Sequence, residues 1–126
     1  MKGKILKILH VNGARGYGGN EQQLLDIASK LDDLEVKNAV FCPMNSELIQ
    51  RLKPYPNVKI FGARHKKFKG AANRKHFKEI INQWKPDVVH LHTSNSLTLF
   101  FFTAILKNLN IRVVFSKKGM SSSMSF

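Results

Sequence analysis

The residues best placed to do chemistry lie in a glycine-rich segment near the start of the chain, residues 13–19. An apolar run precedes this segment, and Asn20 and Glu21 follow it. Glycines let a phosphate or a sugar approach the backbone because they carry no Cβ, and the first N–H groups of a helix attract anions. We therefore predict a loop that binds an anion or a sugar, with a plain tight turn as the alternative. Its candidate binding residues are Gly18, Gly19, Asn20 and Glu21.

The spacing of these glycines argues against two common nucleotide-binding loops. A Walker A loop continues from its last glycine into Lys and then Ser or Thr, whereas Gly18 is followed by Gly19 and Asn20. The dinucleotide fingerprint G-x-G-x-x-G begins at Gly16 and Gly18, but Glu21 occupies the position of its third glycine. A P-loop ATPase and an NAD-binding domain are therefore both disfavoured.

Two histidines mark a second candidate site. His90 and His92 are two residues apart in an apolar run, so in a strand both side chains lie on one face of the sheet. We expect His90 to be a packed core residue, while His92 stands nearer the end of the strand. No zinc site is expected, because no third or fourth ligand stands at a suitable spacing. The polar residues that follow either bind sugar hydroxyls or, in the case of Ser94 or Ser96, cap the next helix. The candidates for sugar binding are Thr93, Ser94 and Asn95.

The chain is strongly basic, with 21 Lys and Arg against 8 Asp and Glu and a formal net charge of +13. Much of this charge falls in residues 64–78, which contain no acidic residue. Such a basic segment attracts anionic lipid, nucleic acid or a phosphorylated substrate; a solvated face with a mobile loop is the alternative. The candidates for anion or membrane binding are Lys66, Lys67, Lys69, Arg74, Lys75 and Lys78.

Strands and helices are predicted to alternate, which is typical of an α/β fold with a doubly wound parallel sheet. In such sheets ligands bind at the carboxyl ends of the strands, so residues 16–20, residues 92–95 and residues 116–119 should meet at one cleft. Asn20 is expected to cap the first helix, with Gln23 reaching back to it. The strands are predicted at 4–12, 35–42, 58–61, 88–92 and 112–115, the helices at 20–33, 46–52, 72–84 and 96–108, and a loop at 121–125.

Length and composition set further bounds. A chain of 126 residues is enough for one domain with a real core. Its single cysteine, Cys42, cannot form an internal disulfide, which fits a reducing compartment. The most apolar segment, residues 96–106, is too short to span a bilayer and is expected to be a buried helix.

Three motifs, in order along the chain, together resemble the N-terminal domain of glycosyltransferase family 4, which has the GT-B fold. They are GYGGNEQQLLDIASKL at 16–31, KPDVVHLH at 85–92 and RVVFSKKG at 112–119. The resemblance implies a Rossmann-like domain in which Gly18 and Gly19 lie near the donor's diphosphate and sugar. It also implies that His92 is the catalytic residue, beside the transferred sugar and the acceptor. Lys118 and Gly119 are further candidate substrate-binding residues, where some family members have a His-Gly pair.

The resemblance implies metal-independent, retaining transfer of a sugar from a nucleotide-sugar to a lipid-linked or saccharide acceptor, with no cofactor. Such chemistry serves surface polysaccharide or lipopolysaccharide biosynthesis, and the protein is expected in the cytoplasm or peripherally on the inner face of the cell membrane. Residues 1–126 are expected to form an incomplete N-terminal, acceptor-side domain, inactive alone, because the C-terminal donor-binding domain is absent. The alternatives are a basic nucleic-acid-binding α/β module, which has too few aromatic residues in its basic segment to be favoured, and a non-catalytic subunit completed by a partner chain.

Overall fold

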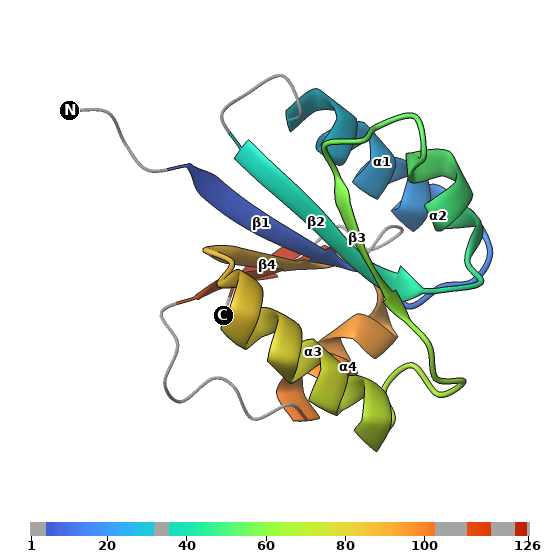
Figure 1. The fold of residues 1–126 in the computed structure, drawn as a ribbon, viewed down its shortest axis with the longest axis vertical. Coiled ribbons are helices and arrows are strands. Elements are labelled where there is room, and N and C mark those ends of the chain that lie inside the picture. The colour runs from blue at the N-terminus through green and yellow to red at the C-terminus, as the bar shows by residue number, and fades with distance from the viewer. Residues whose placement is uncertain (1–4, 32–35, 103–110, 117–122, 126) are drawn as a thin grey trace.

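The computed structural model describes residues 5–31, 36–102, 111–116 and 123–125. A parallel sheet forms its centre, with strands in the order β3-β2-β1-β4-β5 (Figure 1). This order confirms the predicted Rossmann-like α/β fold. The parallel strands are β1 (Leu6–Val11), β2 (Val36–Pro43), β3 (Lys59–Ala63), β4 (Val88–Leu91) and β5 (Arg112–Ser116).

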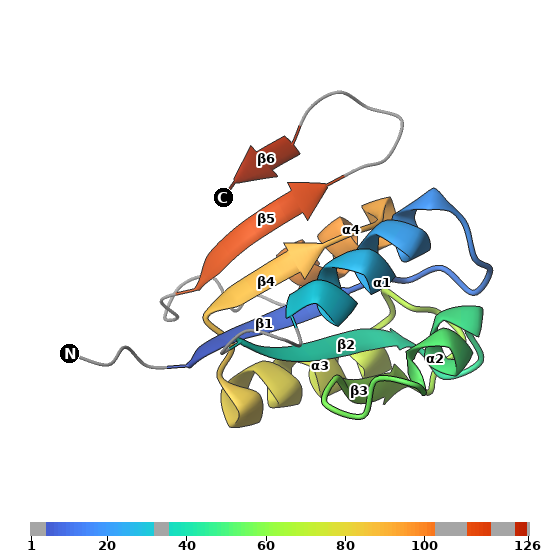
Figure 2. The same ribbon diagram turned by 90° about the horizontal axis from the view of Figure 1, so that it is seen from above.

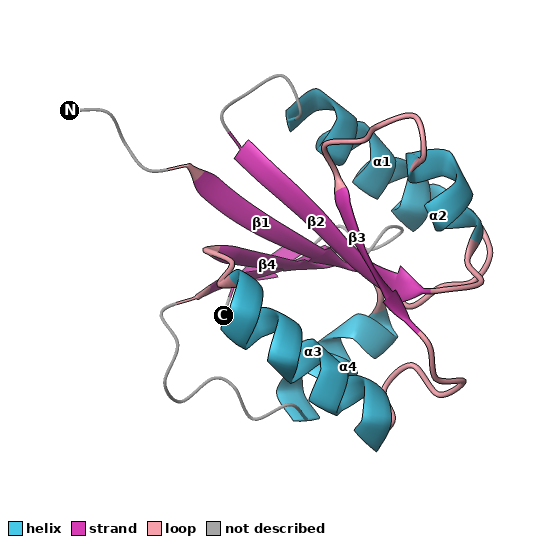
Figure 3. Cartoon of the chain, viewed as in Figure 1, coloured by secondary structure: helices cyan, strands magenta, loops and turns pink. Residues whose placement is uncertain are grey.

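Helices cover both faces of the sheet, as Figures 1 and 3 show. The helices α1 (Gly19–Leu31) and α2 (Glu47–Leu52) lie on one face, and α3 (Ala71–Trp84) and α4 (Ser94–Phe102) lie on the other. Helix α3 ends at Trp84 because Lys85 adopts a left-handed conformation, with φ of 54°, and Pro86 follows it. The predicted helix at 96–108 begins two residues earlier than expected, and its residues 103–108 lie outside the described part of the chain.

Successive side chains of each strand point to opposite faces of the sheet, and this alternation divides the core into two layers. Leu9 and Val11 of β1 pack with Phe77 of α3 and Phe100 of α4. His10, between them, projects to the opposite face, where α1 and α2 build the second layer. Both faces of a parallel sheet are covered by helices, which explains why its strands read as nearly continuous apolar runs and why a polar residue inside one stands out.

The serine-rich tail does not follow the prediction of a loop. Ser123–Ser125 form a short strand, β6, which pairs antiparallel with β5 at the edge of the sheet (Figure 2). Serine has little strand preference of its own. The open edge of β5 supplies unpaired backbone donors and acceptors, and pairing with them explains a strand that the side-chain pattern does not predict.

Candidate functional site at the carboxyl edge of the sheet

The structure brings the glycine segment and the segment after β4 together at the carboxyl edge of the sheet. The backbone N–H of Gly13 donates to Thr93 Oγ1 at 3.1 Å, and Asn95 Nδ2 donates to the carbonyl of Gly13 at 3.3 Å. The N–H of His92 donates to the carbonyl of Val11 at 2.9 Å, which continues the pairing of β1 with β4 past the end of the strands. The predicted residues 92–95 take part in this meeting, and the glycine segment takes part through Gly13, which lies outside the residues 16–20 that the prediction named. Lys118 and Gly119 lie outside the described residues.

Gly13 is the glycine whose missing side chain matters most for this contact. A Cβ on Gly13 would overlap the side-chain amide of Asn95, whereas a Cβ on Gly16 would meet nothing within 4 Å. The close approach of the two loops therefore depends on Gly13. Sequence analysis placed Gly13 in the loop but did not single it out, because its partner Asn95 lies 82 residues away.

Glu21 holds the start of α1. Its Oε1 accepts from the N–H of Gly18 at 2.8 Å, and its Oε2 accepts from Asn12 Nδ2 at 2.9 Å. The helix begins at Gly19, so Glu21 is the residue that reaches back to the N-cap position, as in a capping box. The prediction that Asn20 caps the helix and Gln23 reaches back is wrong, because Asn20 already lies in the first turn.

Asn12 is a site residue that sequence analysis missed. It is fully buried directly after β1, where its Oδ1 accepts from the N–H of Ala14 at 2.9 Å while its Nδ2 donates to Glu21. Asn12 thus fixes the turn out of β1 and ties it to the start of α1. A polar residue that ends an apolar run is the signal that indicates such a role.

Thr93 caps α4, which begins at Ser94. The N–H groups of Ser96 and Leu97 donate to the Thr93 carbonyl at 3.1 and 3.2 Å, and the Ser96 N–H also lies 3.3 Å from Thr93 Oγ1. Ser96 is buried and donates its hydroxyl to the carbonyl of Val11 at 2.9 Å. The expectation that Ser94 or Ser96 is the cap is therefore wrong. Ser94 is exposed at the start of the helix.

Three histidines, one from β1 and two from the end of β4, form a cluster beneath these loops. His10 Nδ1 lies 3.0 Å from His92 Nε2, and the rings of His90 and His92 stack with centroids 3.9 Å apart. His90 Nε2 lies 3.0 Å from the hydroxyl of Ser116. The prediction that His90 and His92 share a face is confirmed. We refer to His10, His90 and His92 as the histidine cluster.

The hydrogen bonds of the histidine cluster define its protonation. Asn38 Oδ1 only accepts, so His10 Nε2, 3.1 Å away, donates to it. A neutral His10 ring then offers Nδ1 as an acceptor, and His92 Nε2–H donates to it. His92 Nδ1 is left as a buried acceptor that has no partner among the described residues.

Burial keeps the histidine cluster uncharged at neutral pH. Burial and, to a lesser extent, the neighbouring His90 lower the pKa of His10 to about 4, although the hydrogen bond with Asn38 opposes the shift. Burial also lowers the pKa of His90 to about 4. The pKa of His92 is held well below its ordinary value by burial and then by His10 and His90. The three rings can therefore donate and accept hydrogen bonds, but they carry no positive charge near pH 7.

A third potential metal ligand does stand beside His90 and His92, contrary to the expectation from their spacing. In the described part of the chain, the ligand atoms of His10, His90 and His92 all lie within 4.8 Å of one another. Sequence spacing could not reveal this group, because His10 is brought to His90 by the pairing of β1 with β4. In the structure, each ring has at least one nitrogen at hydrogen-bonding distance from a neighbouring side chain.

The basic segment is held in place by its own packing. Phe68 is buried against Phe41, with ring centroids 5.5 Å apart. Asn73, fully buried in α3, donates to the carbonyls of His65 and Lys67 at 3.2 and 3.0 Å. Arg74 is half-buried, and the remaining predicted anion-binding residues are exposed: Lys66, Lys67, Lys69, Lys75 and Lys78. The segment therefore presents its lysines from a defined loop and from the first turns of α3.

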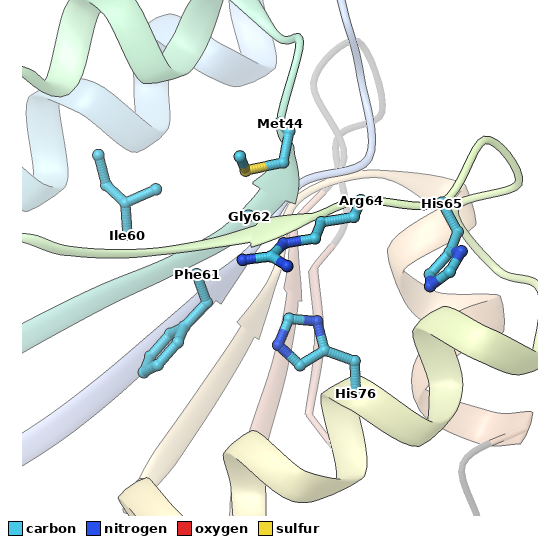
Figure 4. A pocket seen from close by; sticks show the side chains of 7 residues that line it. All are labelled: Met44, Ile60, Phe61, Gly62, Arg64, His65 and His76. Carbon is cyan, nitrogen blue, oxygen red and sulfur yellow. The ribbon is translucent and has the colours of Figure 1, made fainter.

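A cavity of about 620 Å³ lies beside the edge strand β3. Figure 4 shows Phe61 and Met44 at its wall, with Arg64 from the strand end and His76 from α3. It shares no lining residue with the loops that meet around Gly13. We therefore do not include it in the candidate site.

Comparisons with known proteins agree with the fold. The chain matches the model of Glycosyltransferase Family 4 over residues 17–123. It is similar to the crystal structure of a glycosyltransferase from Rickettsia africae ESF-5, with a TM-score of 0.63 and 19% identity over 89% of this chain and 29% of that chain. It is also similar to Anabaena Alr3699/HepE, solved in complex with UDP and glucose, with a TM-score of 0.57 and 19% identity over 78% of this chain and 26% of that chain. The chain thus spans less than a third of either structure. No curated protein matches it.

Proposed function

Because the chain belongs to glycosyltransferase family 4, we propose that it forms the acceptor-side part of an enzyme that moves a sugar from a nucleotide-sugar to a lipid-linked or saccharide acceptor. The observation that carries this proposal is the hydrogen-bonded meeting of the glycine segment with the segment after β4. This meeting point lies at the carboxyl edge of the sheet, where doubly wound folds bind ligands. We place the reaction in surface polysaccharide or lipopolysaccharide biosynthesis.

In this proposal the exposed start of α1 receives part of the substrate. Gly18 and Gly19 are exposed there, and Glu21 and Asn12 hold the loop from beneath. The backbone N–H groups at a helix start stabilise negative charge, such as the charge that develops on a departing nucleotide diphosphate. Glu21 then acts as a positioning residue, since both of its carboxylate oxygens already accept hydrogen bonds.

A direct role for His92 in the reaction stays a prediction. Its side chain is 1% exposed, and its low pKa makes it a neutral hydrogen-bonding group at pH 7. A neutral imidazole can orient a hydroxyl group but cannot neutralise a departing diphosphate. We therefore assign charge stabilisation to the helix start and to basic side chains, and we keep His92 as the candidate contact to the transferred sugar.

We also propose that transfer is metal-independent and retaining. In the described residues near the site, Glu21 is the carboxylate at hand, and it is occupied in holding the loop. The histidine cluster is engaged in hydrogen bonds within itself and with Asn38 and Ser116. Asp87 lies at the opposite, amino end of β4, where its Oδ2 accepts from the N–H of Lys7 at 2.9 Å. Positioning and electrostatic stabilisation then carry the reaction, and turnover of the native enzyme should persist in excess EDTA.

Residues 1–126 should show no turnover by themselves, because donor binding belongs to a further domain in this proposal. The test is a sugar-transfer assay of the purified chain with a panel of nucleotide-sugars. Release of nucleoside diphosphate above the protein-free rate would contradict this part of the proposal. Co-purification of a separate polypeptide would instead favour the alternative of a subunit completed by a partner.

Binding to an anionic membrane surface is proposed for the basic segment. No helix among the described residues is long and apolar enough to cross a membrane. Reversing four charges, in the variant K66E/K67E/K75E/K78E, should abolish sedimentation of the chain with vesicles containing phosphatidylglycerol, because each basic residue near such a surface contributes about 1 kcal/mol. Vesicles of phosphatidylcholine alone are the control. Unchanged sedimentation of the variant would mean that the segment is only a solvated face.

A further inference from the structure

A second cavity, of about 470 Å³, adjoins the meeting point of the two loops. It opens between the glycine segment, the basic segment, the start of α3 and the first turns of α4. Asn95, whose amide donates to the carbonyl of Gly13, forms part of its wall. The cavity is therefore continuous with the candidate site.

The charge of this cavity has one sign. None of the residues that line the cavity carries a carboxylate. Four of the lining side chains are cationic: Arg15, Lys67, Lys69 and Arg74. They come from two separate stretches of chain, the glycine segment and the basic segment, which the fold brings to one place. Asn95 and Thr98 add neutral polar groups to the wall. Guanidinium and ammonium groups around one cavity match the oxygens of a phosphate.

The cations are presented from fixed backbone. Arg15 donates from Nε to Asn45 Oδ1 at 3.2 Å and from Nη2 to the carbonyl of Lys66, so its guanidinium is oriented along the basic segment. The basic segment is in turn fixed by buried Phe68 and by the bond from the N–H of Gly70 to the carbonyl of Lys67 at 2.9 Å. A site whose backbone is already ordered loses less entropy on binding than a mobile one.

We propose that this cavity binds a phosphate or diphosphate group, and that in the complete enzyme this group belongs to the acceptor. The proposal that the cavity binds a phosphate rests on its lining residues alone. The assignment of this phosphate to the acceptor rests on the proposed function, because it assumes that the acceptor meets the donor at the adjoining loops. It narrows the acceptor class to molecules that carry a phosphate or diphosphate near the hydroxyl that receives the sugar.

The test is a calorimetric titration of the chain with pyrophosphate at 150 mM salt. At this salt concentration, interactions between exposed charges more than about 8 Å apart are largely screened. The wild-type chain should bind, and K67Q/K69Q should bind roughly tenfold or more weakly, because two charge-assisted contacts are lost. The matched control is K30Q/K53Q, which removes the same charge at two exposed positions outside both the cavity and the basic segment. Its affinity should stay within about twofold of the wild type.

Two outcomes would overturn the proposal: no binding by the wild-type chain, or equal weakening in both double variants, which would show attraction by net charge only. Phosphatidylglycerol vesicles identify the source of the phosphate. If lipid headgroups were the ligand of the cavity, pyrophosphate would compete with the vesicles for the wild-type chain, and that result would overturn assignment to the acceptor. If the native enzyme transfers sugar but residues 1–126 do not bind pyrophosphate, the cavity proposal fails while the proposed function stands.

Discussion

The variant E21A should lower the free energy of unfolding by about 2 to 4 kcal/mol. Truncation leaves the buried amide of Asn12 without its acceptor, which costs about 1 to 3 kcal/mol. It also removes the acceptor for the N–H of Gly18 at the start of α1, and loss of a helix cap costs about 0.5 to 2 kcal/mol. Urea unfolding at pH 7.5, followed by circular dichroism, measures the change.

The matched control for this prediction is E47A. Glu47 also lies in the first turn of a helix, but it pairs with Arg51 at 2.7 Å on the surface, where both side chains are 47% exposed. Exposed pairs of this kind contribute about 0 to 1 kcal/mol. Equal losses in E21A and E47A would contradict the assignment of Glu21 as the residue that holds the loop.

Mild acid should destabilise the chain through the histidine cluster. Between pH 6.5 and about 4 the unfolded chain protonates His10 while the folded chain does not, because its pKa falls from 6.5 to about 4 on folding. The unfolded state then binds more protons, so the free energy of unfolding falls as the pH is lowered through this window. For His10 the loss at the acid end is about 3 kcal/mol, and His90 and His92 shift in the same direction.

The variant H90Q tests this prediction without leaving a buried cavity. Gln can still hydrogen-bond to Ser116, while one protonation site and its repulsion of His10 are removed. The slope of unfolding free energy against pH, measured by urea unfolding from pH 7 to pH 4.5, should become shallower than in the wild type. H65Q, which removes an exposed histidine outside the cluster, is the control. A slope in H90Q as steep as in the wild type would contradict the role of the cluster.

Local pattern accounts for the parts of the fold that sequence analysis predicted. The strand β1 is encoded by an apolar run and the helix α3 by helical spacing of its apolar residues, and both patterns depend on residues close together in the chain. The glycine segment and residues 92–95 could be assigned to one edge because parallel strands all end there. That assignment needed only the element order.

Contacts set by strand register could not be predicted in the same way. His10 joins His90 only because β1 pairs with β4, and these residues are 80 positions apart. Asn12 and Gly13 likewise acquire their roles from partners that the turn geometry brings close. The helix cap was misassigned because Asn20 and Glu21 both have capping chemistry, and the choice between them depends on whether the helix begins at Gly19 or two residues later.

The central claim is that this chain is the acceptor-side part of a sugar-transferring enzyme. The most direct measurement is a transfer assay run in parallel on residues 1–126 and on the native polypeptide or assembly that carries them, purified from its own cells. Labelled nucleotide-sugars serve as donors and the lipid extract of those cells as acceptor. We predict label in the lipid or saccharide fraction with the native material and none with residues 1–126 alone. Transfer by residues 1–126 alone, or no transfer by the native material with any donor of the panel, would contradict the claim.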